Sequence, residues 1–114
     1  TGGTMRLGGY RCYLAPESLA RKIYDKEEII ERHRHRYEFN DFFKENLNSN
    51  GFITSGICPD NNLVEISEIK DHPFMIGSQF HPEFGSRLDK PHPLFDSFIR
   101  ACINQKKIGA QFKL

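Results

Sequence analysis

The chain alternates apolar and polar residues with periods that predict both strands and helices. Residues 10–14 alternate with a period of two, which predicts a strand, and residues 1–9 contain four glycines and predict a loop running into it. Phe52–Cys58 and Leu63–Lys70 also predict strands, and the polar turn residues between them indicate a hairpin. The mostly apolar run Phe74–Phe80 is typical of a buried strand.

Two short helices are expected in the first half of the chain. Leu19 and Ile23 are four residues apart and share a helical face, which predicts a helix over Glu17–Tyr24. Asn40 is a favourable N-cap for a second helix, Asp41–Asn50, and the glycine that follows is well placed to end it.

A third helix is expected to begin near Pro93. Its apolar residues recur with the i, i+3, i+4 spacing of an amphipathic helix. They are Leu94, Phe95, Phe98, Ile99, Cys102 and Ile103. Residues 108–114 lack this pattern and are expected to form a tail. Strands and helices interleave along the chain, so the sequence predicts an α/β fold.

The segment Glu28–Tyr37 admits two interpretations. Its charge density is typical of an exposed helix, whereas three arginines alternate strictly with His33, His35 and Tyr37, as the residues of a strand do. The alternation favours a strand. The run suits an anion site, a metal site built on the two histidines, a nucleic-acid patch, or a solvated edge strand with no ligand.

Composition narrows the class of protein. The chain has 114 residues, of which 38% are hydrophobic and 27% charged, as in ordinary globular domains. The net charge of +1 gives no indication of nucleic acid or membrane binding, and no apolar run approaches the ~18 residues of a membrane span. Three cysteines without a CxxC pair predict reduced thiols in a cytoplasmic protein. The chain begins at Thr1, so we expect it to be part of a longer protein.

The strongest candidate for chemistry is Gln-Phe-His-Pro-Glu at residues 79–83. His81 follows a predicted strand, where open α/β sheets place their sites. Residues i and i+2 of extended backbone point to one side, so His81 and Glu83 are expected to face one cavity. An imidazole with a pKa near 6.5 exchanges protons at neutral pH, and a neighbouring carboxylate fixes its tautomer. The alternative is a turn with solvated side chains.

No cysteine of the chain has the surroundings of a nucleophile that His81 would activate. A reactive thiolate is expected at a sharp strand-to-helix turn or at a helix N-terminus. Cys12 falls within a predicted strand, and Cys58 lies before a turn with no helix after it. Cys102 lies on the apolar face of the last helix, where a core role is expected. We expect all three to be structural, and His81 with Glu83 to serve a nucleophile that this chain does not contain.

Four stretches together resemble one family. They are Gly-Gly-Thr-Met-Arg-Leu-Gly (residues 2–8), Glu-Arg-His-Arg-His-Arg-Tyr-Glu (31–38), Gln-Phe-His-Pro-Glu-Phe (79–84) and His-Pro-Leu-Phe (92–95). In this order they resemble the C-terminal part of the class I glutamine amidotransferase domain of the CTP synthase family. The resemblance covers residues 1–107 and implies the C-terminal portion of a three-layer, flavodoxin-like domain with a mixed sheet flanked by helices.

The resemblance implies roles for four residues. His81 and Glu83 match the histidine and carboxylate of the family's glutaminase triad, and Arg36 matches an arginine that binds glutamine, with Tyr37 beside it. In the family a cysteine attacks the side-chain amide of glutamine and forms a glutamyl thioester. The ammonia passes to a synthetase domain, which uses ATP and Mg²⁺ to aminate UTP.

The resemblance also implies what lies outside this chain. The cysteine elbow, the oxyanion-hole glycines and the other glutamine contacts precede the matching segment in the family. We therefore expect no metal or cofactor on these residues, and as partners glutamine, the rest of the domain, the synthetase domain and further copies, since the family forms tetramers. Nucleic acid and membrane are not expected partners. Two alternatives stay open: a non-catalytic anion- or metal-binding module, and an inactive regulatory relative.

Overall fold

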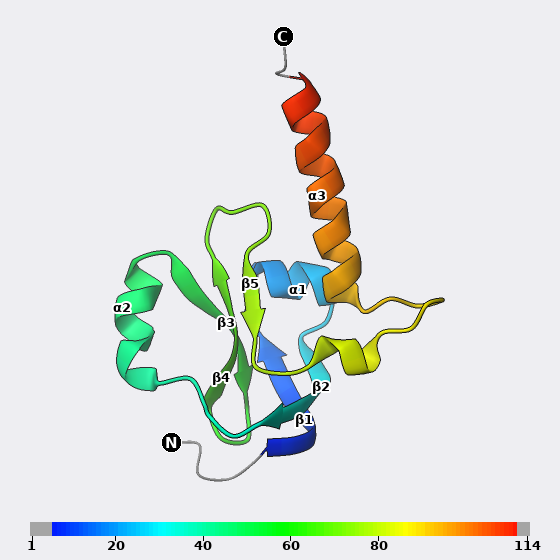
Figure 1. The fold of residues 1–114 in the computed structure, drawn as a ribbon. Coiled ribbons are helices and arrows are strands. Elements are labelled where there is room, and N and C mark those ends of the chain that lie inside the picture. The colour runs from blue at the N-terminus through cyan, green and yellow to red at the C-terminus, as the bar shows by residue number, and fades with distance from the viewer. Residues whose placement is uncertain (1–5, 112–114) are drawn as a thin grey trace.

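The computed structural model describes residues 6–111, which contain a five-stranded sheet in the order β2-β1-β3-β4-β5 (Figure 1). The strands are β1 (Arg6–Leu14), β2 (Glu28–His35), β3 (Phe52–Cys58), β4 (Leu63–Ile69) and β5 (Ile76–Ser78). The helices are α1 (Leu19–Tyr24), α2 (Lys44–Ser49) and α3 (Pro93–Gln111), with 3-10 turns η1 (Asp41–Phe43) and η2 (Pro82–Gly85). Every neighbouring pair of strands in this part of the chain is antiparallel. The interleaved elements confirm the predicted α/β class.

The strand interpretation of the arginine–histidine run is confirmed. In β2 the residues Ile29, Glu31 and His33 are buried, while the residues between them are exposed. The predicted hairpin is also confirmed, because β3 and β4 pair across the turn at residues 59–62. The loop predicted for residues 1–9 is wrong from Arg6 onward, where the chain already pairs with β2. The preceding glycine-rich residues lie outside the described part.

The buried strand predicted over Phe74–Phe80 is wrong in length and in burial. Only Ile76–Ser78 form a strand, β5, and two of its three residues are exposed. The reason is position: β5 is an edge strand that pairs with β4 alone, so only one side of it meets other backbone. Within the predicted run only Phe80 is buried.

The first two helices are shorter than predicted because side-chain caps define their starts. Ser18 accepts a hydrogen bond from the backbone N–H of Arg21 at 3.0 Å and caps α1, so Glu17 stays outside the helix. Asn40 caps the next segment as predicted, accepting from the N–H of Phe42 at 3.0 Å. That segment is the 3-10 turn η1, and α2 begins only after it.

The last helix is longer and far more exposed than predicted. α3 continues through residues 108–111, where the sequence predicted a tail, and residues 112–114 lie outside the described part. Figure 1 shows α3 projecting beyond the sheet, so its distal turns meet no other element there. Leu94 is buried, but Cys102 is exposed, and the core role expected for Cys102 is wrong. None of the helices within residues 6–111 has both the length and the apolarity needed to cross a bilayer.

The core lies where α1, the start of α3 and one face of the sheet meet. Its buried residues are Cys12, Leu14, Ala20, Ile29, Ile66, Phe80 and Leu94. β3 approaches this core through Gly56, at a register irregularity in its pairing with β4. A Cβ atom at residue 56 would lie 2.8 Å from the Cys12 sulfur and 2.8–2.9 Å from side-chain carbons of Ile66. The close approach of the strands therefore requires glycine at this position.

We predict that Gly56→Ala destabilises the chain by about 1–3 kcal/mol, the usual cost of overpacking a filled core. The new methyl group must displace Cys12 or Ile66, both of which are held by their strands. Denaturant-induced unfolding measures the change in free energy. Gly77→Ala is the matched control, because a Cβ atom there meets nothing within 4 Å. Equal stability of the two variants would contradict this account of Gly56.

Candidate active site

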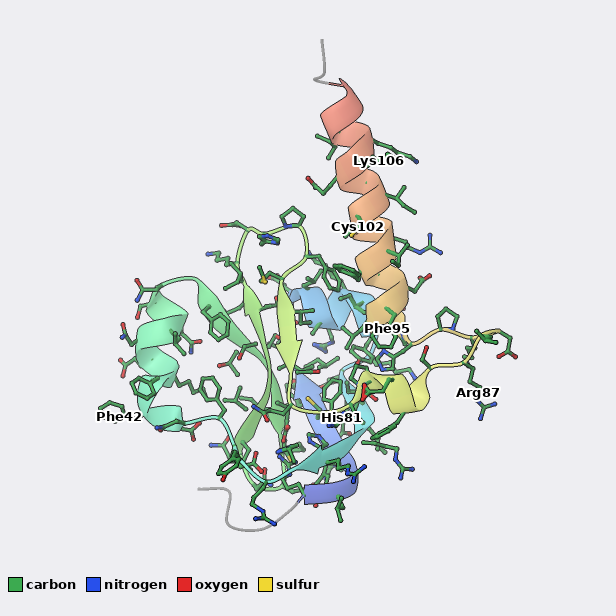
Figure 2. All side chains as sticks on the ribbon, in the orientation of Figure 1. Phe42, His81, Arg87, Phe95, Cys102 and Lys106 are labelled. Atoms are coloured by element: carbon green, nitrogen blue, oxygen red, sulfur yellow. The ribbon has the colours of Figure 1, made fainter. Side chains whose placement is uncertain are left out.

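The site forms where the two sides of the sheet separate. β1 and β3 pair only at Tyr13↔Ile57 and Leu14↔Gly56. Beyond that point the strand pair β1–β2 diverges from the strand pair β3–β4. The chain leaving β5 crosses this separation. The N–H of Gln79 donates to the Glu65 carbonyl of β4 at 2.8 Å, and that of His81 donates to the Arg32 carbonyl of β2 at 2.8 Å. His81 is thereby fixed against β2 at the start of η2 (Figure 2).

The structure brings His81 and Glu83 together, as predicted, but by a different route. His81 Nδ1 lies 2.5 Å from Glu83 Oε1, and both side chains are partly open to solvent. The backbone is not extended between them. His81 is the N-cap of η2 and Pro82 occupies its first turn, so a 3-10 turn supplies the contact. The ring of Phe84 stacks on His81 with centroids 5.3 Å apart.

The pair has a defined proton arrangement. An ionised carboxylate only accepts hydrogen bonds, so the proton between the two groups lies on His81 Nδ1 and leaves Nε2 as the basic nitrogen. The backbone N–H of Glu83 and then the His81 ring hold the pKa of the Glu83 carboxyl below its ordinary value. Glu83 is therefore ionised at neutral pH, as a residue that orients an imidazole must be.

The other predicted site residues lie just past the end of β2. Arg36 is exposed, and so is Tyr37, with 79% of its surface accessible. Among the described side chains, no hydrogen bond or ion pair joins either residue to His81 or Glu83. The Tyr37 carbonyl accepts from His35 Nδ1 at 3.0 Å, which ties this segment to the end of the strand.

His81 and Glu83 together are called the dyad below, and none of the three cysteines contacts it. Cys12 and Cys58 are buried, and burial raises the pKa of Cys12 to about 12, which keeps it a neutral thiol. Cys102 lies well along α3, away from His81 (Figure 2). No cysteine of the described chain therefore stands where His81 would activate it.

A buried ionic cluster lies behind the dyad, and sequence reasoning missed most of it. Arg6 Nη1 of β1 lies 2.7 Å from Glu65 Oε1 of β4 and 3.1 Å from Glu38 Oε2. The guanidinium also lies over the Tyr10 ring, 4.3 Å from its centroid. His33 completes the cluster, with Nε2 3.6 Å from Glu65 Oε2. The one local signal was a glutamate within an apolar strand, at Glu65.

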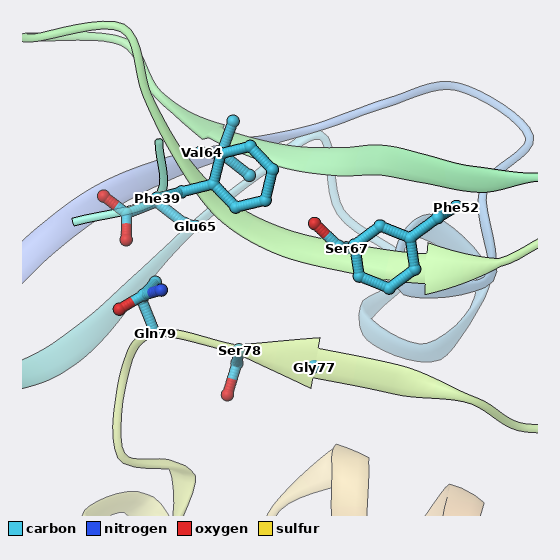
Figure 3. A pocket seen from close by; sticks show the side chains of 8 residues that line it. All are labelled: Phe39, Phe52, Val64, Glu65, Ser67, Gly77, Ser78 and Gln79. Carbon is cyan, nitrogen blue, oxygen red and sulfur yellow. The ribbon is translucent and has the colours of Figure 1, made fainter. Parts of the chain in front are cut away.

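His33 connects the cluster to the segment that carries the dyad. Its ring meets Phe80, the residue before His81, edge-on with centroids 5.8 Å apart. His35 Nδ1 donates to the Tyr37 carbonyl, so its Nε2 is free to accept from His33 Nδ1 at 2.7 Å. The lone pair of His33 Nε2 then faces Glu65. A pocket of about 200 Å³ is lined by Gln79, by Glu65 and other residues of β4 and β5, and by Phe39 and Phe52 (Figure 3).

His33, His35 and Glu65 also form the group most suited to a metal ion in the described residues. One ligand atom from each lies within 4.8 Å of the others. Ligands of a tetrahedral zinc ion stand about 3.4 Å apart. The two imidazoles are instead hydrogen-bonded to each other at 2.7 Å, and the Arg6 guanidinium already contacts the Glu65 carboxyl group at 2.7 Å. These contacts fit a hydrogen-bonded ionic cluster better than a metal centre.

Burial shifts the two titratable groups of this cluster in opposite directions. Burial raises the pKa of Glu65 to about 7 from its ordinary 4.5, although Arg6 acts in the opposite direction. Burial, followed by the charges of Arg6 and His35, lowers the pKa of His33 to about 4 from 6.5. Between pH 4.5 and 6.5 one proton therefore sits on Glu65 in the folded chain and on His33 in the unfolded chain.

Comparisons with known proteins give one consistent family. The model described as glutamine amidotransferase class-I matches residues 1–101. A CTP synthase of Treponema denticola is 56% identical and one of Pelobacter propionicus 58% identical, each over 105 residues. Each match covers 92% of this chain and 20% of the relative, so the chain spans about a fifth of the length of these curated relatives.

One solved structure extends the comparison to three dimensions. The glutaminase domain of Trypanosoma brucei CTPS, solved with bound acivicin, matches with a TM-score of 0.82 at 34% sequence identity. The match covers 89% of this chain and 40% of that chain.

We predict that Glu65→Gln and His33→Gln change the pH dependence of stability with opposite signs. In Glu65→Gln, His33 is the one titratable group of the two that remains. Its pKa is lower in the folded chain than in the unfolded chain, so stability is lost as the pH falls from 6.5 to 4. In His33→Gln only Glu65 remains, whose folded pKa is raised, so stability is lost as the pH rises from 4.5 to 7.

The measurement is the free energy of unfolding at each pH, relative to the unsubstituted chain. One group gives a slope of at most about 1.4 kcal/mol per pH unit. In the unsubstituted chain the two contributions offset each other between pH 4.5 and 6.5. Slopes of the same sign in both variants would show that the cluster does not exchange its proton in this way.

Proposed function

The chain belongs to the class-I glutamine amidotransferase family, and we propose that it supplies the histidine and the glutamate of the glutaminase site of a CTP synthase. The matches to the family model and to a solved glutaminase domain confirm the predicted class I amidotransferase fold. The observation that carries the proposal is the 2.5 Å contact between His81 Nδ1 and Glu83 Oε1, at an exposed turn of that fold.

The chemistry assigned to the dyad follows from its proton arrangement. His81 Nε2 accepts the proton of a cysteine thiol supplied by the rest of the domain, and the thiolate attacks the side-chain amide carbon of glutamine. The imidazolium returns the proton to the departing nitrogen, which leaves as ammonia, and a glutamyl thioester remains. Water then attacks the thioester, with His81 accepting its proton, and glutamate and the free thiol are released. Glu83 stabilises the imidazolium in each half-reaction.

Arg36 and Tyr37 are proposed to bind the glutamine substrate. Arg36 is exposed and has no hydrogen-bonded or ion-paired partner among the described residues, so its guanidinium is free to pair with the α-carboxylate of glutamine. Tyr37 stands beside it, at the end of the strand that holds His81.

The proposal extends to the whole protein. Ammonia from glutamine would pass to a synthetase domain that uses ATP and Mg²⁺ to convert UTP to CTP. The remaining part of the glutaminase domain, the synthetase domain and further copies of the protein are the expected partners, with a tetramer as the assembly. The described residues offer no site that fits a metal better than a hydrogen-bonded cluster. Three free cysteines support a cytoplasmic location.

A metal-binding module is the second candidate function, favoured by the proximity of His33, His35 and Glu65. Binding of Zn²⁺ to the chain, abolished by His35→Ala, would support it. The contact between Arg6 and Glu65 makes this candidate the weaker one, because a guanidinium and a metal ion would compete for the same carboxylate. An inactive regulatory relative is separated from the first proposal by the activity measurement below.

We predict that His81→Ala abolishes glutamine-dependent CTP formation and leaves ammonia-dependent CTP formation intact. The test enzyme is the Treponema denticola CTP synthase with its matching segment replaced by this chain, which is 56% identical to it. Loss of an acid–base residue costs about 10²- to 10⁴-fold in rate. CTP formation from glutamine and from ammonium salt measures the two activities separately.

The matched control is His72→Ala, which removes an exposed histidine outside the dyad. The 114-residue chain by itself is expected to release no ammonia from glutamine. Loss of both activities in His81→Ala, or hydrolysis by the chain alone that disappears in Cys58→Ala, would contradict the proposal.

We predict that Arg36→Ala raises the KM for glutamine about ten- to a hundredfold in the same enzyme, with a smaller effect on kcat. A hydrogen bond to a charged group contributes about 1.5–3 kcal/mol, and Arg36 is proposed to bind the ground state and the transition state alike. Arg34→Ala is the matched control, since Arg34 is an exposed arginine of the same run. An unchanged KM for glutamine in Arg36→Ala would remove Arg36 from the substrate site.

A further inference from the structure

The segment that carries the dyad is fastened at both ends to neighbouring residues of β2. At its start, the N–H of His81 donates to the carbonyl of Arg32 at 2.8 Å. At its end, the His92 ring is hydrogen-bonded through Nε2 to the carboxylate of Glu31, the residue before Arg32. His92 and Glu31 are both buried, with 4% and 8% of their surfaces exposed. The turn η2 and the loop after it, residues 82–92, therefore form an arch whose two ends are attached to adjacent residues of β2.

The bonds to the His92 ring define its charge state. His92 Nδ1 accepts from the backbone N–H of Leu94 at 3.1 Å, at the start of α3. The ring proton therefore lies on Nε2 and is donated to Glu31, so His92 is a neutral donor. Tyr24 of α1 donates its hydroxyl to the same Glu31 oxygen at 2.5 Å. Burial, followed by the bond to Glu31, raises the pKa of Tyr24, which keeps that hydroxyl protonated.

Two contacts pass from His92 to the dyad. The backbone N–H of His92 donates to Ser86 Oγ at 3.0 Å, and the N–H of Ser86 donates to the Glu83 carbonyl at 3.3 Å. The ring also packs directly against the end of η2, because a Cβ atom added at Gly85 would lie 3.3 Å from His92 Cδ2. η2 spans only four residues and has exposed side chains, so it needs such support to hold one conformation.

We propose that His92, held by Glu31, is a positioning residue for the His81–Glu83 dyad. The effect of His92 on catalysis rests on the proposed glutaminase function, whereas the hydrogen bonds that position the dyad do not depend on it. His92 is buried, and its hydrogen bonds go to Glu31, Leu94 and Ser86 rather than to His81 or Glu83; it acts by fixing the turn on which Glu83 stands. Loss of this support lets η2 rotate and separates the Glu83 carboxylate from His81 Nδ1. Misplacement of about 1 Å is enough to cost a hundredfold in rate.

The experiment measures the contact between His81 and Glu83 in the full 114-residue chain by NMR. The ¹⁵N chemical shift of His81 Nδ1 reports its bond to Glu83, and the change in that shift on Glu83→Ala defines the coupling. We expect His92→Phe, which keeps the ring size but removes the hydrogen bonds, to reduce this coupling to less than half. His92→Gln, which can still donate to Glu31, is expected to retain most of it.

Leu94→Ala is the matched control. It removes a buried side chain at the same end of α3 and leaves the bond between His92 and Glu31 in place, so the coupling is expected to persist. Full coupling in a folded His92→Phe chain would overturn the proposal. If His92→Phe loses the dispersed amide spectrum of a folded chain, Glu31→Gln decides, because it only weakens the acceptor: partial loss of coupling supports the proposal and full coupling overturns it.

The same substitution in the chimeric CTP synthase separates the two proposals. His92→Phe is expected to lower kcat with glutamine at least tenfold, with little change in KM and none in ammonia-dependent activity. A chimera without glutaminase activity, together with a coupling that depends on His92 in the chain, would refute the glutaminase proposal alone. An active chimera with unchanged kcat in His92→Phe would refute the positioning role alone.

Discussion

The backbone hydrogen bond from His81 to Arg32 is the constraint on which the candidate site depends. β1 and β3 share only two paired positions, and beyond them the sheet opens into two sides. The chain leaving β5 closes this opening by bonding first to β4, through Gln79, and then to β2, through His81. The dyad is thus placed by a connection between the two sides of the sheet, and its position depends on how far apart those sides stand.

The buried charges between the two sides explain how this separation is held. Arg6 and His33 come from one side and Glu65 from the other, and burying them costs free energy unless they compensate each other. Arg6 contacts both Glu65 and Glu38, and between the folded pKa values of about 4 and 7 Glu65 and His33 together hold a single proton. A buried ionic cluster contributes little to net stability, but moving one member away from the others leaves a buried charge uncompensated, which is strongly destabilising. It therefore favours one spacing of the strands, and with it one position of His81.

Sequence reasoning succeeded where structure is determined locally. The alternation in residues 28–35 and the turn between β3 and β4 identified β2 and the hairpin, because burial of one strand face follows a two-residue period. Spacing also identified the contact between His81 and Glu83, although a 3-10 turn rather than a strand creates it.

Sequence reasoning failed where the outcome depends on distant residues. The apolar run before His81 forms an edge strand, and α3 projects beyond the sheet. Phe74 of the run packs against Phe98 of α3, with ring centroids 5.4 Å apart, but Met75, Ile99 and Ile103 stay exposed. Glu65 lies 32 residues from His33, and His92 lies 61 residues from Glu31, so no local pattern links them. Their roles follow from topology, which periodicity does not specify.

The arch over β2 also determines where the length of the chain can change. Its outer part is closed by reciprocal backbone hydrogen bonds between Arg87 and Lys90, at 3.1 and 3.2 Å. Because Ser86 already fixes η2 to His92, residues added near this tip would enlarge a loop whose ends stay in place. Doubling a flexible loop costs only about 0.6 kcal/mol of closure entropy. Insertions at the tip of the arch are therefore expected to cost little stability, whereas an insertion between His81 and Ser86 would break the turn that holds the dyad.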